Sequence, residues 1–152
     1  MRPVLFVDLG RFLAGRGTMG RKAEQPRIAL VVEDDTEVRR LAAALLEETE
    51  FDVVEAASAE EAVDYLSAHA DAVAFLFADI RLPCRMNGLD LARTVSVRWP
   101  WVRTVLTSGA PLDGGSHRLP GDVRFMPKPW RALDVLVEAE RASTIGSPAT
   151  KK

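Results

Sequence analysis

From Arg27 onward, short apolar runs alternate with stretches in which apolar residues recur at helical spacing, and few folds accommodate such a pattern. The run Ile28–Val32 is continuous and rich in β-branched residues, as expected for a strand that is buried on both faces. The stretch that follows has one apolar helical face, formed by Val38, Leu41, Ala42, Leu45 and Leu46. Repeated strand–helix units of this kind predict an α/β domain with a parallel sheet.

The same pattern continues to the end of the apolar sequence. Further strands are predicted over residues 51–55, 73–78, 102–106 and 123–126. Further helices are predicted over residues 58–69, where Ser58 and Glu61 form a capping box, over 89–98, and from Pro129 onward. Residues 110–121 are rich in Gly and Pro, so any fourth helix there is expected to be short or irregular.

The 152 residues leave room for one ordinary domain. We expect a disordered leader over residues 1–26, a folded domain over 27–142 and a flexible tail over 143–152. Gly15 to Gly20 match a dinucleotide-binding fingerprint in letters, but no strand precedes them and no apolar helix follows, so a linker is favoured. Met19 is a second candidate start of the chain.

Charge and cysteine content exclude several classes of function. Residues 1–27 hold six basic and two acidic residues, whereas the remainder holds fourteen basic and twenty acidic residues, a net charge of −6. An acidic body without a basic stripe argues against direct nucleic-acid binding. The single cysteine, Cys84, rules out an internal disulfide, and no apolar run is long enough to span a bilayer. We therefore expect a cytoplasmic protein with no membrane partner.

Chemically active residues gather where the predicted strands end. Strand one is followed by Glu33, Asp34 and Asp35, strand three by Asp79, strand four by Thr107 and Ser108, and strand five by Lys128. In doubly wound sheets the ligand site lies beyond the carboxyl ends of the strands. Clustered carboxylates suit Mg²⁺, which takes oxygen ligands, and an ammonium and a hydroxyl suit phosphate oxygens. The sequence therefore predicts a magnesium-dependent phosphoryl site.

Four strings in this order resemble the response-regulator receiver domain, over about Arg27 to Ala142, and in particular the stand-alone, chemotaxis-type single-domain regulators. They are Val31–Asp35, Asp79–Pro83 with Met86–Leu89, Leu106–Gly109 and Phe125–Pro129. The resemblance implies a doubly wound, flavodoxin-like sheet of five parallel strands in the order 2-1-3-4-5, with helices on both faces.

The resemblance also implies a role for each site residue. Asp79 is expected to accept the phosphoryl group, with Mg²⁺ held by Glu33, Asp34, Asp79 and the carbonyl of Arg81. Thr107 is expected to move to the phosphoryl group, Lys128 to be its counter-charge, and the aromatic ring of Phe125 to turn on activation. Asp35 is expected outside the metal's ligand set.

The sequence departs from the common receiver pattern in three places. One additional residue, within Cys84–Arg85, lengthens the loop beside Asp79. The Gly-rich segment over residues 110–121 puts in doubt the recognition surface usually formed by the fourth helix, the fifth strand and the fifth helix. Trp130 adds an aromatic side chain next to the Lys-Pro pair.

The implied partners are a histidine kinase or histidine phosphotransfer protein and a downstream protein target, and the sequence leaves a homodimer open. We expect no enzyme activity beyond phosphotransfer and autodephosphorylation. One alternative is a pseudo-receiver that binds partners without being phosphorylated. Another is a phosphatase resembling haloacid dehalogenases, although Arg81 stands where that family has a second Asp.

Overall fold

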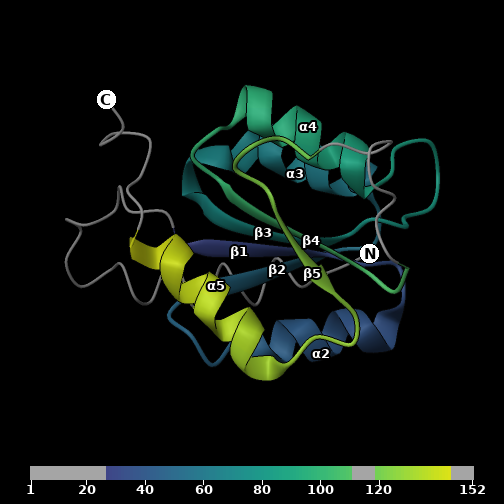
Figure 1. Cartoon of the computed structure of the whole chain (residues 1–152). Helices are drawn as coiled ribbons and strands as arrows, with labels where there is room; N and C mark the ends of the chain where they lie inside the picture. The colour runs from purple at the N-terminus through teal and green to yellow at the C-terminus, as the bar shows by residue number, and fades with distance from the viewer. Residues whose placement is uncertain (1–26, 111–118, 145–152) are drawn as a thin grey trace.

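The computed structural model in Figure 1 describes residues 27–110 and 119–144. Five strands occur in these residues: β1 (Ile28–Val32), β2 (Asp52–Ala56), β3 (Val73–Asp79), β4 (Arg103–Ser108) and β5 (Arg124–Pro127). The helices are α2 (Thr36–Leu46), α3 (Ala59–His69), the 3₁₀ helix η1 (Ala70–Ala72), α4 (Gly88–Arg98) and α5 (Ala132–Thr144). Among them, none combines the length and the apolar content that crossing a bilayer requires.

The strands form one parallel sheet in the order β2-β1-β3-β4-β5, which confirms the predicted topology. Figure 1 shows α3 and α4 on one face of this sheet and α2 and α5 on the other. The predicted covering of both faces by helices is therefore confirmed. The sheet is doubly wound about β1, because the chain goes from β1 to β2 on one side and returns to β3 on the other.

Strands β1 to β4 contribute side chains to two separate cores, because neighbouring residues of a strand point to opposite faces. Leu30 packs in the core beneath α3 and α4, whereas Val31 packs in the core beneath α2 and α5. All seven residues of β3 are buried, since this strand lies at the centre of the sheet. Burial on both sides explains why β1, and β3 as far as Ala78, are continuous apolar runs in the sequence.

Helix α2 buries most of the face that the sequence predicted, and Leu41 is the exception. Its buried residues are Ala42, Ala43 and Leu46, whereas Leu41, predicted to face the core, is 56% exposed. The helix is turned so that Arg39, one turn before Ala43, points towards the sheet. The guanidinium of Arg39 donates to the backbone carbonyl of Glu33 and to the carboxylate of Glu55, and these contacts hold this side of the helix at the sheet.

Helix α5 begins at Ala132 and not, as predicted, at Pro129. The first turn is fixed by the carbonyl of Arg131, which accepts hydrogen bonds from the N–H groups of Asp134 and Val135. Residues 128–130 instead form a bent connection that leaves Trp130 packed against the core beneath α2 and α5. The helix continues to Thr144, two residues past the predicted domain end at 142.

Other predictions concern residues that lie outside the described ranges. The expected leader over 1–26 is among them, as are the tail beyond Thr144 and most of the Gly-rich segment, at residues 111–118.

The capping box predicted for α3 is present in one half. Ser58 Oγ accepts a hydrogen bond from the Glu61 N–H, as predicted, but the Glu61 carboxylate accepts from the N–H of Ala57 and not from that of Ser58.

Replacing Leu66 by Ala should destabilise the domain. Leu66 on α3 is completely buried in the core shared with α4, and deleting a buried leucine side chain leaves a cavity that costs about 2–5 kcal/mol. Leu133→Ala on α5 is the matched control, because Leu133 is 68% exposed and its truncation should change stability by no more than about 0.5 kcal/mol. Urea denaturation of both variants checks this, and equal stabilities would contradict the assigned core.

Candidate phosphoryl site

The polar residues predicted at the strand ends meet at one edge of the sheet, between β1, β3 and β4. Glu33 directly follows β1, Asp79 is the last residue of β3, and Thr107 on β4 pairs in register with Asp79. The crossovers leave β1 and β3 in opposite directions, so this edge is the switch point of the sheet, where such folds bind ligands. The topology therefore brings together residues that are up to 95 positions apart in the sequence.

Three carboxylates form the acidic part of the site. Oxygen atoms of Glu33, Asp34 and Asp79 all lie within 4.8 Å of one another. Glu33 and Asp79 are only 5% and 6% exposed, whereas Asp34 is open to solvent. Glu33 is held in place by the backbone N–H of Asp35, which donates to its Oε2 over 3.1 Å. Buried carboxylates at this spacing repel one another unless cations compensate them.

Lys128, which directly follows the edge strand β5, supplies a cation that compensates these carboxylates. Its Nζ lies 3.1 Å from Asp79 Oδ2 and 3.2 Å from Glu33 Oε1. The lysine is positioned by its own backbone N–H, which donates to the carbonyl of Ser108 and so continues the pairing of β5 with β4. One ammonium thus bridges the two buried carboxylates.

Burial and charge shift the ionisation of both partners. Burial is the main reason that the pKa of Glu33 is raised; the Asp35 N–H opposes the shift and the charge of Asp79 adds to it. Burial alone would lower the pKa of Lys128, but hydrogen bonds and attraction from Asp79 and Glu33 outweigh it, so its pKa is raised. Lys128 therefore remains an ammonium at neutral pH, beside the carboxyl groups of Glu33 and Asp79.

The two hydroxyls at the end of β4 are in different situations. Ser108 Oγ accepts a hydrogen bond from the N–H of Ala110, which stabilises the turn after the strand. Thr107 is 2% exposed, and its Oγ1 is buried without a hydrogen-bond partner among the described residues. Of the two hydroxyls that the sequence offered, Thr107 is thus the one free to bind a group at Asp79.

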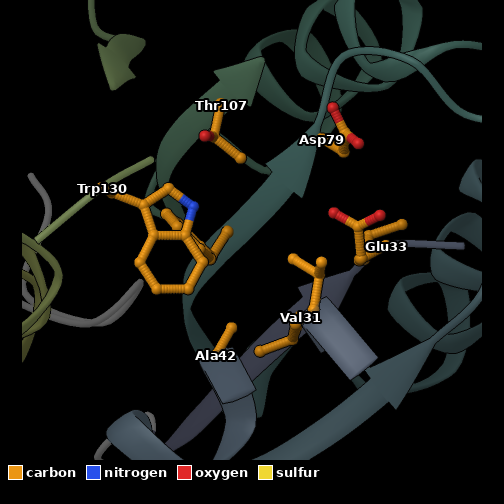
Figure 2. A pocket seen from close by; sticks show the side chains of 9 residues that line it. Val31, Glu33, Ala42, Asp79, Thr107 and Trp130 are labelled. Carbon is orange, nitrogen blue, oxygen red and sulfur yellow. The ribbon is translucent and has the colours of Figure 1, made fainter. Parts of the chain in front are cut away.

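A small pocket adjoins these residues on the α2 and α5 face of the sheet (Figure 2). Its polar lining consists of Glu33, Asp79 and Thr107, and Trp130 closes one side. The Trp130 ring packs edge-on against Phe77, with centroids 5.5 Å apart. The structure therefore places Trp130, which the sequence presented only as an added aromatic next to the Lys-Pro pair, beside the site itself.

The loop from β3 to α4 is built closely onto Asp79. The backbone N–H of Arg81 donates to Asp79 Oδ1 over 3.2 Å, and the N–H of Gly88 donates to the carbonyl of Ile80 over 2.8 Å. A Cβ atom on Gly88 would lie 2.2 Å from the Asp79 carbonyl oxygen. Only glycine therefore lets α4 start this close to Asp79.

The lengthened part of this loop is fixed to α3. Glu60 Oε2 accepts hydrogen bonds from the N–H groups of Arg85 and Met86, over 3.2 and 3.0 Å. Cys84, just before them, has a positive φ of 73°, a strained conformation for a residue other than glycine. The additional residue is thus accommodated by a left-handed turn and a carboxylate anchor, and β3 keeps its register.

Of the remaining predicted residues, Asp35 is engaged elsewhere and Phe125 lies outside the pocket. Asp35 Oδ1 accepts from the N–H groups of Glu37 and Val38, and so caps the N-terminus of α2. Phe125 is half-buried on β5 and pairs with Leu106, one residue before Thr107. It is therefore next to the Thr107 strand segment but is not among the residues that line the pocket.

Comparison with known families agrees with this geometry. The sequence model of the response regulator receiver domain matches residues 29–138 of the chain. The chain belongs to this family. Its receiver domain thus has the α/β architecture described above, and two-component signalling is the setting in which such domains act.

Individual relatives support the assignment. The chain is 31% identical over 103 residues to the sensor kinase CckA of Brucella abortus (strain 2308); the match covers 66% of this chain but only 11% of that kinase. The receiver domain of NtrX from Brucella abortus is 27% identical with a TM-score of 0.62, covering 76% of this chain and 97% of that one. A receiver domain protein from Clostridium thermocellum is 20% identical with a TM-score of 0.70, covering 77% and 94%, and shows a likeness of fold.

Two residues that support the site could not be found from the sequence. Arg39 looked like a solvent-facing charge on an amphipathic helix, yet its Nη1 binds the carbonyl of Glu33 over 2.9 Å. Gly88 stood in a string that resembled the family, without an assigned role. Its signal was the Asn-Gly pair before an apolar helix, and the structure shows Asn87 and Asp90 in a reciprocal capping box there.

Replacing Gly88 by Ala should disturb Asp79 directly. The added methyl group would meet backbone atoms of Asp79 and Ile80 at 2.2–2.9 Å, so either α4 or the end of β3 must shift. We expect a loss of roughly 1–3 kcal/mol in the free energy of unfolding, as for other overpacked positions. Gly121→Ala is the control, because a Cβ atom there meets nothing within 4 Å. Urea denaturation distinguishes the two, and an unchanged Gly88→Ala variant would refute the close approach.

Proposed function

We propose that this receiver domain accepts a phosphoryl group on Asp79 from a histidine kinase or a histidine phosphotransfer protein, with Mg²⁺, and passes the signal on through protein–protein contacts. The observation that carries the proposal is the position of Asp79. Its carboxylate ends the central strand, is held by Lys128 and by the N–H of Arg81, and faces the acidic pair Glu33 and Asp34.

The donor set fits a magnesium ion. Three carboxylates face a single ammonium, so the cluster has a formal net charge of −2, which a divalent cation would neutralise. Oxygen ligands in such a cluster are those that Mg²⁺ prefers. Glu33, Asp34, Asp79 and the backbone carbonyl of Arg81 are the proposed ligands. When bound, the ion would neutralise charge on the phosphoryl oxygens.

The proposed phosphoryl transfer requires few chemical groups from the protein. A carboxylate oxygen of Asp79 forms a bond to phosphorus while the bond from phosphorus to the donor's imidazole nitrogen breaks, giving an acyl phosphate and a free imidazole. The transferring group carries negative charge on its outer oxygens, so positioned positive charge is the main aid to the reaction. Lys128, now paired with Asp79, is the cation available for that purpose.

Thr107 and Phe125 are the proposed switch residues. A phosphoryl group brings close to two negative charges and strong acceptor oxygens, and the hydroxyl of Thr107 is buried beside Asp79 without a partner. Movement of Thr107 towards the phosphoryl group would alter the space beside Leu106, against which Phe125 pairs on β5. The rearranged β4 and β5 edge would then be read by a partner protein.

Incubation with acetyl phosphate and Mg²⁺ should add one phosphoryl group to the chain, as measured by intact-mass spectrometry. The Asp79→Asn variant should gain none, because a carboxamide cannot form the acyl phosphate. Asp71→Asn is the matched control: Asp71 is an exposed acid in η1, at the opposite end of β3, and its variant should be labelled like the wild type. A wild-type chain that gains no mass would favour the pseudo-receiver alternative.

Replacing Lys128 by Met should make stability depend more strongly on Mg²⁺. Without the ammonium, Glu33 and Asp79 are two buried carboxylates with no cation between them, and we expect a loss of roughly 1–3 kcal/mol in the absence of metal. Because a ligand that binds only the folded state stabilises it, Mg²⁺ should restore more stability to this variant than to the wild type.

Urea denaturation in EDTA and in Mg²⁺ measures both effects. Arg131→Met removes one positive charge from the same connection, but this side chain is 82% exposed and should change neither stability nor its metal dependence. A Lys128→Met variant that is as stable as the wild type in EDTA would contradict the proposed electrostatics.

A further inference from the structure

Two buried polar atoms that lack a hydrogen-bond partner line the same pocket beside Asp79. They are Thr107 Oγ1 and Trp130 Nε1, and within the described residues only one other side-chain atom, Glu60 Oε1, is buried in this way. Buried polar groups in folded proteins are nearly always satisfied, so two exceptions in one pocket need an explanation. Their coincidence suggests that both groups find a partner in another state of the site.

The two groups are chemically complementary. An indole N–H is a donor and nothing else, whereas a threonine hydroxyl donates one hydrogen bond and accepts up to two. Figure 2 shows the nitrogen-bearing edge of the Trp130 ring turned into the pocket, with Thr107 and Asp79 on its rim. A Phe at this position would keep an aromatic ring there but would bring no donor.

The position of the Trp130 ring is restricted by its packing. Phe77 supports it edge-on, and Trp130 packs with the core residues beneath α2 and α5. The backbone of Lys128, two residues earlier, is tied to the carbonyl of Ser108, the residue that follows Thr107. A movement of the Thr107 segment would therefore reach the connection that carries Trp130 through this hydrogen bond.

We infer that, in the phosphorylated state, Trp130 donates its indole N–H to Thr107 Oγ1 and so directs the Thr107 proton towards a phosphoryl oxygen on Asp79. The inference rests on the proposed function. Trp130 is then a positioning residue, which acts through Thr107 and does not touch the reacting atoms. Because a hydroxyl that accepts a hydrogen bond becomes a better donor, the indole would strengthen the contact between Thr107 and the phosphoryl group.

The indole N–H resonances of the full chain, labelled with ¹⁵N-tryptophan, report this contact directly. The Trp130 signal is identified by its loss in Trp130→Phe. On addition of Mg²⁺ and beryllofluoride, a stable mimic of the acyl phosphate, it should move downfield and exchange more slowly with solvent. Trp101 is an internal control, because its Nε1 already donates to the carbonyl of Ala70 over 3.0 Å, and its signal should stay in place.

The Thr107→Val variant identifies the partner. It keeps the shape of the side chain and removes the acceptor, so the downfield movement of the Trp130 signal should disappear. A response that persists in Thr107→Val would overturn the inference, because the indole would then have another partner. A wild-type chain that accepts phosphate by mass spectrometry, but whose Trp130 signal does not respond, would overturn the inference and leave the proposed function standing. A wild-type chain that accepts no phosphate would overturn both.

A double-mutant cycle provides a second, energetic readout. Affinity for beryllofluoride in the presence of Mg²⁺ is measured by calorimetry for the wild type, both single variants and the double variant. Trp130→Phe should weaken binding by roughly 3–10-fold, in line with one neutral hydrogen bond. If Trp130 acts through Thr107, the double variant should bind no more weakly than Thr107→Val alone. Additive losses would contradict the positioning role, since they would mean that Trp130 acts independently of Thr107.

Discussion

The placement of two buried carboxylates against one ammonium is the interaction on which the rest of the site depends. Glu33 and Asp79 are almost inaccessible to water, and only Lys128 lies between them. Such an arrangement is costly unless its partners are held in position, because an unpaired buried charge destabilises the folded state. Each strand end is therefore fixed by a separate backbone contact: Asp35 to Glu33, Arg81 to Asp79, and Ser108 to Lys128.

Residues around the site also hold the strand ends in position, through contacts from the helices and from the loop that follows β3. Arg39 binds the carbonyl of Glu33 from α2 and uses Glu55 on β2 as its own counter-charge. Gly88 allows α4 to start in contact with the backbone of Asp79, and Glu60 holds the lengthened loop that follows β3. Helices on both faces of the sheet thus restrain the segments around Asp79, as the proposed transfer of a phosphoryl group to this carboxylate would require.

The fold and the members of the acidic cluster could be predicted because their signals are local. Strands buried on both faces are uninterrupted apolar runs, and polar residues that follow such runs must lie at the carboxyl edge of a parallel sheet. Glu33, Asp79, Thr107 and Lys128 were found in this way. The exposure of Leu41 on α2 was not predicted, because the apolar pattern around it contained no sign that Arg39 would bind the carbonyl of Glu33. The start of α5 was also missed, because Pro129 suits a first helical turn as well as the bent connection that the structure has there.

The sequence by itself determined the alternation of strands and helices, the identity of the charged residues at the strand ends and the family they resemble. Only the tertiary structure decided which hydroxyl is free, which glycine cannot be replaced and where Trp130 points. These depend on contacts that form only in the folded chain. Ser108 Oγ accepts a hydrogen bond from the N–H of Ala110, Gly88 packs against the backbone of Asp79, and the Trp130 ring packs edge-on against Phe77. Residue patterns carry information about burial and local conformation, whereas hydrogen-bond partners and steric limits exist only once the sheet is assembled.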